Sequence, residues 1–226
     1  MDSKAYAKEH KQAFIAKVVK GKVPVLEEKL AIFMAGTPGA GKTEVVESLM
    51  EFANDEELCV IDSDRFRAQF PGYNGSNSSD FQPGATYLVN TTFDYLLKEG
   101  YSFILDGTFG AHQDVVIRNV KRALKRDYHV ILCFVYQEPL RAWLFTKSRT
   151  KLEGRKVPKE VFIRSYVQMI DNLSIVKETF NDAISYRVVD NSVGYVKGRM
   201  PRMVDDLLDV VPRFYTRQEL EDLLDD

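Results

Sequence analysis

The residues best suited to chemistry lie in one glycine-rich segment, GTPGAGKT, at positions 36–43. It fits the pattern Gly-x-x-x-x-Gly-Lys-Ser/Thr, whose backbone N–H groups curl around phosphate and whose lysine supplies a mobile positive charge. The final hydroxyl of this pattern is a ligand for Mg²⁺. The segment therefore predicts a site for a nucleoside triphosphate and Mg²⁺, with Lys42 also stabilising the outer phosphates during a reaction and Thr43 on the metal. The expected nucleotide contacts are Gly36, Thr37, Pro38, Gly39, Ala40, Gly41, Lys42 and Thr43.

Two aspartates follow the apolar run LCVID, at 58–62, in the segment IDSDRFRAQFPGY. Asp64 is the candidate catalytic base, since a carboxylate near a transferred phosphate can accept the proton of an acceptor hydroxyl. The alternative is that Asp64 caps the following helix. Asp62 either contacts substrate or Mg²⁺ through water, or ends the strand. Arg67 is a candidate substrate contact, with a solvated helix face as the alternative.

A third acidic position, Asp106, ends the apolar run YSFILD and is followed by Gly107 and Thr108. An acid after an apolar strand is typical of residues that hold Mg²⁺ through water in this class of site. Thr108 brings a hydroxyl to the same place. We expect both residues to bind substrate or metal, and a plain Asp-Gly turn is the alternative.

Basic residues gather between positions 141 and 164, around the break EGRKVPKE. A bend there would let arginines fold over a phosphate chain, where the planar guanidinium binds phosphate oxygens and excludes water. Arg149 and Arg155 are the candidate catalytic residues. Arg141 and Arg164 are assigned to a solvated surface.

Apolar runs alternate with segments of helical spacing, which predicts an α/β fold with a parallel sheet of about five strands and helices on both faces. Such sheets bind ligands at the carboxyl ends of their strands. The expected strands are 30–35, 58–62, 101–106, 128–136 and 184–190, and the expected helices are 42–52, 85–99, 112–126, 139–152 and 159–180, with a loop at 71–84. We expect one domain over 1–226, with an N-terminal helix at about 3–20 and an acidic helical tail at about 201–226.

Composition narrows the class further. The 226 residues are 45% hydrophobic and 28% charged, with a formal net charge of -2. No basic excess favours long nucleic acid, and no signal peptide or apolar run of membrane-spanning length is visible, which predicts a cytoplasmic protein. Cys59 and Cys133 lie in apolar runs and are expected to be reduced and buried.

Together, the stretches GTPGAGKT, IDSDRFRAQFPGY, LDGTF, SRTKLEGRKVP and YRVVDNS resemble the zeta toxin family of P-loop kinases, in the family's order across residues 30–192. The resemblance implies a nucleotide-kinase-like fold. It also implies transfer of the ATP γ-phosphate to a sugar hydroxyl, in the best-known members the 3′-hydroxyl of the amino sugar in UDP-N-acetylglucosamine. An inhibitory antitoxin protein is an implied partner.

By motif, Asp64 matches the family's base, and Asp106 and Thr108 match the residues that hold the sugar. Arg149 and Arg155 match the arginines around the transferred phosphate, and Asn191 lies where the family approaches the nucleotide base. Two features depart from the pattern: position 106 is Asp rather than Glu, and no arginine closely follows the threonine.

Several acceptors therefore stay open on the same chemistry: another nucleotide sugar, a polynucleotide end or an antibiotic hydroxyl. A nucleotide-dependent binding switch without a phosphorylated product is the alternative from another class.

Overall fold

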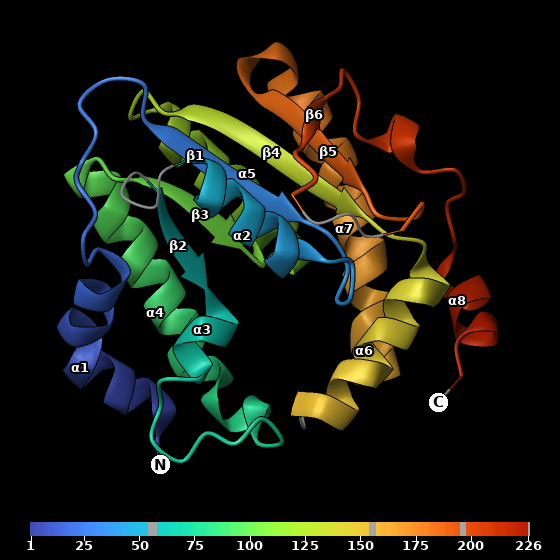
Figure 1. Cartoon of the computed structure of the whole chain (residues 1–226), viewed down its shortest axis with the longest axis horizontal. Coiled ribbons are helices and arrows are strands. Elements are labelled where there is room, and N and C mark those ends of the chain that lie inside the picture. The colour runs from blue at the N-terminus through green and yellow to red at the C-terminus, as the bar shows by residue number, and fades with distance from the viewer. Residues whose placement is uncertain (54–57, 154–156, 195–197, 226) are drawn as a thin grey trace.

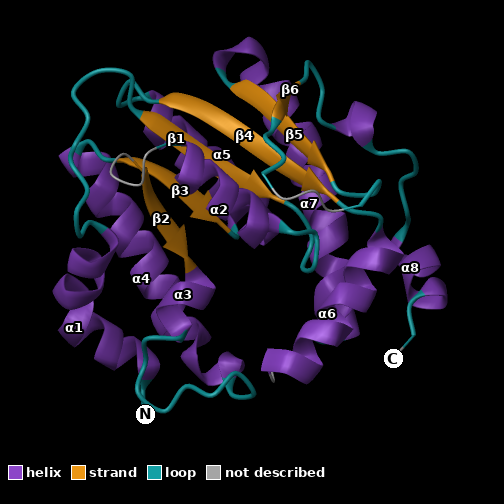
Figure 2. Ribbon diagram, in the orientation of Figure 1, coloured by secondary structure: helices purple, strands orange, loops and turns teal. Residues whose placement is uncertain are grey.

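The chain is built on a mixed sheet in which five parallel strands are extended by one short antiparallel strand (Figures 1 and 2). The computed structural model describes residues 1–53, 58–153, 157–194 and 198–225. The strand order within this part is β2-β3-β1-β4-β5-β6. The strands are β1 (Leu30–Ala35), β2 (Leu58–Asp62), β3 (Ser102–Asp106), β4 (His129–Tyr136), β5 (Ser185–Asp190) and β6 (Arg202–Met203).

Helices cover both faces of the sheet, as the apolar strands require (Figure 1). On β1, Ile32 and Met34 pack with α2, whereas Phe33 on the opposite face packs with α4, α5 and α7. The helices are α1 (Ser3–Val18), α2 (Lys42–Phe52), α3 (Ser63–Arg67), α4 (Ser78–Glu99), α5 (Gln113–Leu124), α6 (Pro139–Glu153), α7 (Lys159–Phe180) and α8 (Arg217–Leu223), with 3-10 turns η1 (Thr108–Gly110), η2 (Asn181–Ala183) and η3 (Leu208–Val210).

Four phenylalanines hold α1, α3 and α4 together beside β2; we call Phe14, Phe66, Phe70 and Phe81 the aromatic cluster. The Phe14 ring centroid lies 6.2 Å from that of Phe66 and 5.3 Å from that of Phe70, and the Phe70 and Phe81 centroids are 5.4 Å apart. All four side chains are buried. Aromatic pairs at these distances stabilise beyond the area they bury, so the short helix α3 has a firm support.

The prediction of a loop over 71–84 was wrong in its second half, because α4 begins at Ser78 and contains Pro83. The composition of this segment hides the helix, since Pro and Gly disfavour helix interiors. Gly84 is needed there for packing: a Cβ at this position would press on the backbone carbonyl of Ser3. The Ser3 hydroxyl also donates to the Asp80 carbonyl at 2.7 Å. Tertiary packing against α1 thus outweighs the local preference.

The tail is also less helical than expected, and the sheet has a sixth strand. Met203 pairs with Arg187 in the antiparallel β5–β6 ladder, so residues 202–203 are strand. Only η3 and α8 are helical in the described part of the tail. The tail then returns to α6, where the Trp143 indole N–H donates to the carbonyl of Asp225 at 2.9 Å.

Cys59 and Cys133 are free and buried, as expected. Among the described residues, no helix is both long enough and apolar enough to cross a bilayer.

Candidate active site

The parallel register brings the predicted polar residues to one edge of the sheet. Asp62 at the end of β2 is the register partner of Asp106 at the end of β3, and Asp106 is also opposite Met34 of β1. The glycine-rich segment follows β1 directly. The carboxyl ends of three neighbouring strands therefore supply a phosphate-binding loop and two carboxylates, at the place where such folds bind ligands.

The glycine-rich segment adopts the backbone that its composition predicts. Gly39 and Gly41 have φ values of 78° and 92°, a region that favours glycine. Gly41 is the N-cap of α2 and provides no side chain there, so the first N–H groups of α2 remain available to an anion. A Cβ at Gly39 would overlap the carbonyl of Ala142, which shows that the loop lies directly against α6.

The lysine of the loop is held in place by the loop itself. Lys42 Nζ donates to the carbonyls of Gly36 at 2.9 Å and Thr37 at 3.1 Å. The hydroxyl of Thr37 is buried without a hydrogen-bond partner among the described residues. An ammonium group and an orphaned hydroxyl beside available N–H groups form a cradle that suits a phosphate chain.

Asn191, at the end of β5, supports this loop from the side. Its side-chain amide donates to the carbonyl of Ala40 at 2.8 Å, its backbone N–H donates to Tyr136, and Gln137 donates to its carbonyl at 3.1 Å. Asn191 is buried, yet it lines the cavity described below. Its side-chain amide therefore helps to hold the phosphate loop in shape.

These groups surround one cavity of about 670 Å³. The loop forms one wall, the start of α3 forms a second, and α6 forms a third, with Met169 of α7 beneath. The cavity brings together most of the candidate residues: Gly36, Pro38, Gly39, Ala40, Gly41, Lys42, Thr43, Asp62, Asp64, Asp106, Arg149 and Asn191. Arg155 and the side chain of Thr108 lie outside the described part of the structure, whereas Thr37 and Arg67 are described but do not line the cavity.

The two aspartates after β2 have different local tasks. Asp62 is the N-cap of α3, and its Oδ1 accepts from the N–H of Asp64 at 2.7 Å. Arg65 Nε lies 3.9 Å from the other Asp62 oxygen. Asp64 is in the first turn of α3, so capping falls to Asp62, and the side chain of Asp64, 38% exposed, reaches the cavity.

Asp106 lies in a buried environment with charged groups on several sides. Burial raises its pKa, while the charge of Lys42 opposes this rise; Asp62 raises the pKa further, and the Gly107 N–H and Arg65 oppose it. Its Oδ1 is buried and lacks a hydrogen-bond partner within the described residues. A buried carboxylate oxygen without a partner, facing a cavity, is a position that a cation or a hydroxyl would satisfy.

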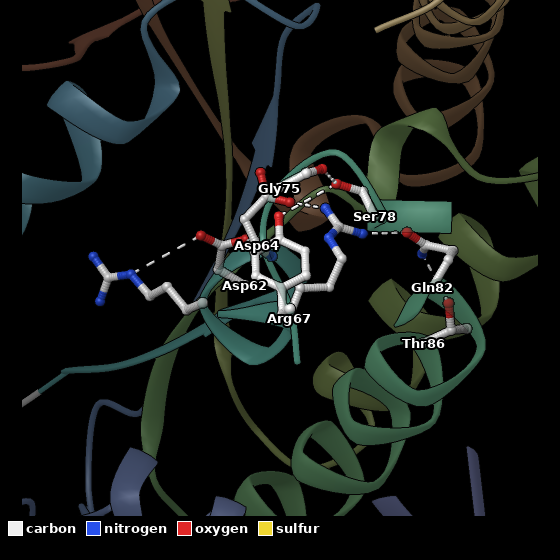
Figure 3. Close-up of polar contacts among 9 residues, drawn as sticks. Asp62, Asp64, Arg67, Gly75, Ser78, Gln82 and Thr86 are labelled. Carbon is white, nitrogen blue, oxygen red and sulfur yellow. Dashed lines mark hydrogen bonds and ion pairs between the residues drawn. The ribbon is translucent and has the colours of Figure 1, made fainter. Parts of the chain in front are cut away.

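Arg67 contacts Asp64, as Figure 3 shows, and it does not line the cavity. Its guanidinium pairs with the carboxylate of Asp64 and donates to the side-chain oxygen of Gln82 on α4. The pairing with Asp64 follows from the sequence, since residues three apart share a helix face. The partner on α4 does not, because the helix that carries it was expected to be a loop.

The α6 wall supplies the cations and also exposed apolar side chains. Arg149 is exposed and lines the cavity, and Arg141, assigned from sequence to a solvated surface, lines it too and donates to the Ser192 carbonyl at 2.7 Å. Leu144 and Phe145 line the same wall although each is at least half exposed. Sequence reasoning missed Arg141, and the available signal was its place in the first turn of the helix that follows β4.

A phosphate loop between the first strand of a parallel sheet and its helix, facing carboxylates from two adjacent strands, defines a P-loop kinase. The family model for zeta toxin matches residues 15–197. The chain belongs to the zeta toxin family, and with this fold it is a phosphotransferase.

Solved structures share the fold at low sequence identity. The chain is similar to a structure from the PezAT chromosomal toxin-antitoxin system of Streptococcus pneumoniae, with 20% identity, a TM-score of 0.70, and coverage of 97% of this chain and 91% of that one. It is also similar to the AvrRxo1-ORF1:ORF2 complex, with 13% identity, a TM-score of 0.66, and coverage of 87% and 66%.

A second structure of the AvrRxo1 complex, with ATP, has 13% identity, a TM-score of 0.62, and coverage of 90% and 68%. No curated protein matches the chain.

Proposed function

We propose that the protein is an ATP-dependent small-molecule kinase that transfers the γ-phosphate to a hydroxyl of a nucleotide sugar such as UDP-N-acetylglucosamine. One observation carries the proposal: Lys42 on the phosphate loop and the carboxylate of Asp64 on α3 line the same cavity. A triphosphate on the loop and an acceptor beside Asp64 would share that space. This juxtaposition supports transfer to a bound hydroxyl.

The residues on the two sides of the cavity would divide the reaction between them. Asp64 orients the acceptor hydroxyl and takes its proton as the oxygen forms a bond to the γ-phosphorus. The bond between that phosphorus and the bridging oxygen breaks, and ADP leaves. Lys42 carries the charge on the outer phosphates, and the α2 N-terminus adds its positive potential. Positioning and electrostatics supply most of the rate.

Oxygen donors suited to Mg²⁺ line the same region. The hydroxyl of Thr43 and the carboxylates of Asp62 and Asp106 would hold this ion, the carboxylates through water, and the orphaned Asp106 oxygen fits that use. When bound, Mg²⁺ supplies neutralisation of phosphate charge.

The acceptor side of the cavity favours a ligand rich in hydroxyl groups. Carboxylates have two oxygens that accept hydrogen bonds from hydroxyls, so the oxygens of Asp62 and Asp106 that do not face a metal-bound water would orient a sugar, with Thr108 assigned there by family motif. Arg149 would close over the transferring phosphate, and Arg155 joins it by family motif. Family membership, rather than geometry, supports UDP-N-acetylglucosamine in particular.

The direct test incubates the protein with ATP, Mg²⁺ and a panel of nucleotide sugars, aminoglycosides and oligonucleotide ends. Mass spectrometry then detects the gain of one phosphate. Asp64→Asn should lower the transfer rate by about a thousandfold, within the usual contribution of a general base, while ATP affinity stays within twofold. A nucleotide-dependent switch predicts ATP hydrolysis with no phosphorylated product and no such dependence on Asp64.

We also propose an inhibitory antitoxin as a protein partner. Its support is family membership and the similarity to a structure from a toxin-antitoxin system. Toxicity on expression in bacteria, lost in Asp64→Asn, would support this part of the proposal. Harmless expression of an enzyme that is active in vitro would overturn it.

A further inference from the structure

Arg67 is a buried cation at the edge of the proposed active site. The residue is 3% exposed, whereas the side chain of its ion-pair partner Asp64 is 38% exposed. Burying a guanidinium is costly unless charged or polar groups satisfy it. The buried guanidinium of Arg67 must therefore be satisfied by specific partners.

Its two terminal nitrogens point to different elements (Figure 3). Nη2 pairs with Oδ1 of Asp64 in the same helix, and Nη1 donates to Oε1 of Gln82 on α4. The amide nitrogen of Gln82 in turn donates to the hydroxyl of Thr86 at 3.0 Å. A guanidinium is planar and rigid, so fixing one nitrogen fixes the direction of the other.

The first turns of α4 are themselves anchored. The Ser3 hydroxyl, at the start of α1, donates to the Asp80 carbonyl at 2.7 Å and accepts from the Gly84 N–H at 3.3 Å. Gln82 lies between these two contacts in sequence. The turn of α4 that carries Gln82 is thus anchored to α1 on both sides of this residue.

We propose that Arg67 is a positioning residue that holds the Asp64 carboxylate toward the acceptor, with its own orientation set by Gln82. The inference rests on the proposed function for the role of Asp64. It replaces the substrate contact expected for Arg67 from the sequence, because Asp64 lines the cavity and Arg67 does not.

The test compares kcat and KM in Arg67→Gln and Arg67→Lys. We expect Arg67→Gln to lower kcat about fiftyfold, with KM for ATP and acceptor within threefold, because misdirecting a base affects the transition state more than binding. Arg67→Lys should recover at least a fifth of the lost rate, since it restores the charge. A rise in acceptor KM with unchanged kcat would overturn the proposal in favour of substrate contact.

A matched control is Arg122→Gln. Arg122 pairs with Asp94 between α5 and α4, and neither residue lines the cavity. It should leave kcat within twofold of the wild type. An equal loss of kcat in this variant would show that any lost Arg–Asp pair lowers activity, and would overturn the specific role.

A double-mutant cycle separates positioning from general stability. If Arg67 acts through Asp64, adding Arg67→Gln to Asp64→Asn should lower the residual rate by less than threefold. A further fiftyfold loss would contradict the proposal. Should Arg67→Gln fail to fold, Gln82→Leu tests the same link, with an expected fivefold to tenfold fall in kcat.

A measurement that does not depend on catalytic activity distinguishes this inference from the proposed function. In ¹⁵N NMR, an anchored guanidinium gives separate, slowly exchanging Nη signals, and we expect those of Arg67 to merge in Asp64→Asn. Unchanged signals would overturn the ion pair. If the wild type phosphorylates no acceptor, yet its Arg67 signals are separate and merge in Asp64→Asn, the proposed function would be overturned while the anchored carboxylate is retained.

Discussion

The two walls that face each other across the cavity are built in opposite ways. The wall that carries Asp64 is the start of α3, which packs against α1 and α4 through the aromatic cluster and is also fixed by the buried Arg67. The α6 wall presents Arg149, Leu144 and Phe145 with large exposed surfaces. The contrast indicates that packing within the fold itself holds Asp64, the proposed proton acceptor, in place.

The two walls also differ in how much their side chains contribute to the stability of the fold. A buried support makes the position of Asp64 depend on fold stability, because its neighbours cannot change without loss of packing. Side chains on the α6 wall are mostly in water and contribute little to folding. Substitutions on the α6 wall should therefore change activity without changing stability. Substitutions behind Asp64 should lower both.

The largest expected effect on stability is that of Phe66→Ala in the aromatic cluster. The side chain is 1% exposed, and truncating a buried phenylalanine costs about 3–5 kcal/mol of unfolding free energy. Chemical denaturation measures this directly. Leu144→Ala on the α6 wall, where the residue is 53% exposed, should cost under about 0.5 kcal/mol. Similar costs for the two variants would remove the contrast.

On the opposite wall, Arg149→Ala should lower kcat/KM by about a hundredfold, the scale of one lost charge-stabilising donor, without lowering the melting temperature. Arg164→Ala on α7 is the control, since Arg164 is exposed and does not line the cavity. Steady-state kinetics and thermal unfolding on both variants decide the matter. Equal effects of the two arginines would indicate a general charge effect.

A smaller effect concerns Asp106, where the sign depends on pH. Its native pKa is raised, so the folded state holds its proton more tightly than the unfolded state does, and the ionised group costs stability at neutral pH. Asp106→Asn should raise the melting temperature at pH 7 by about 2–4 °C, which is roughly 1 kcal/mol for a chain of this size.

This gain should shrink as the pH falls toward the ordinary aspartate value of 3.8, because the folded carboxyl is then protonated and the unfolded carboxyl increasingly takes up its proton as well. Scanning calorimetry between pH 4 and 7 measures the difference. A gain that grows as the pH falls would contradict the assigned direction of the pKa shift. Activity should fall in the same variant, because the carboxylate that lowers stability is also the group proposed to bind the metal or the acceptor.

Much of the site could be predicted from local sequence. The glycine-rich segment, Lys42 and the aspartates after β2 and β3 are motifs whose spacing requires no knowledge of distant residues. The parallel sheet followed from apolar runs alternating with helical spacing.

The support behind the site could not be predicted, because it depends on contacts between distant segments. Pro83 and Gly84 disguise the start of α4, so the partner of Arg67 was hidden. The fold of Asn191 onto Ala40 and that of Trp143 onto Asp225 join residues 151 and 82 positions apart. Arg155, by contrast, lies outside the described residues, and its assignment stays a prediction.

The contact between Gly39 and Ala142 has a consequence for engineering the enzyme. Because Gly39 touches the backbone of α6 with no room for a methyl group, the phosphate loop and the first turn of the helix that carries Arg149 are in direct contact. A change in the loop that accommodates a different nucleotide would therefore also displace that helix. The loop and the helix have to be redesigned together.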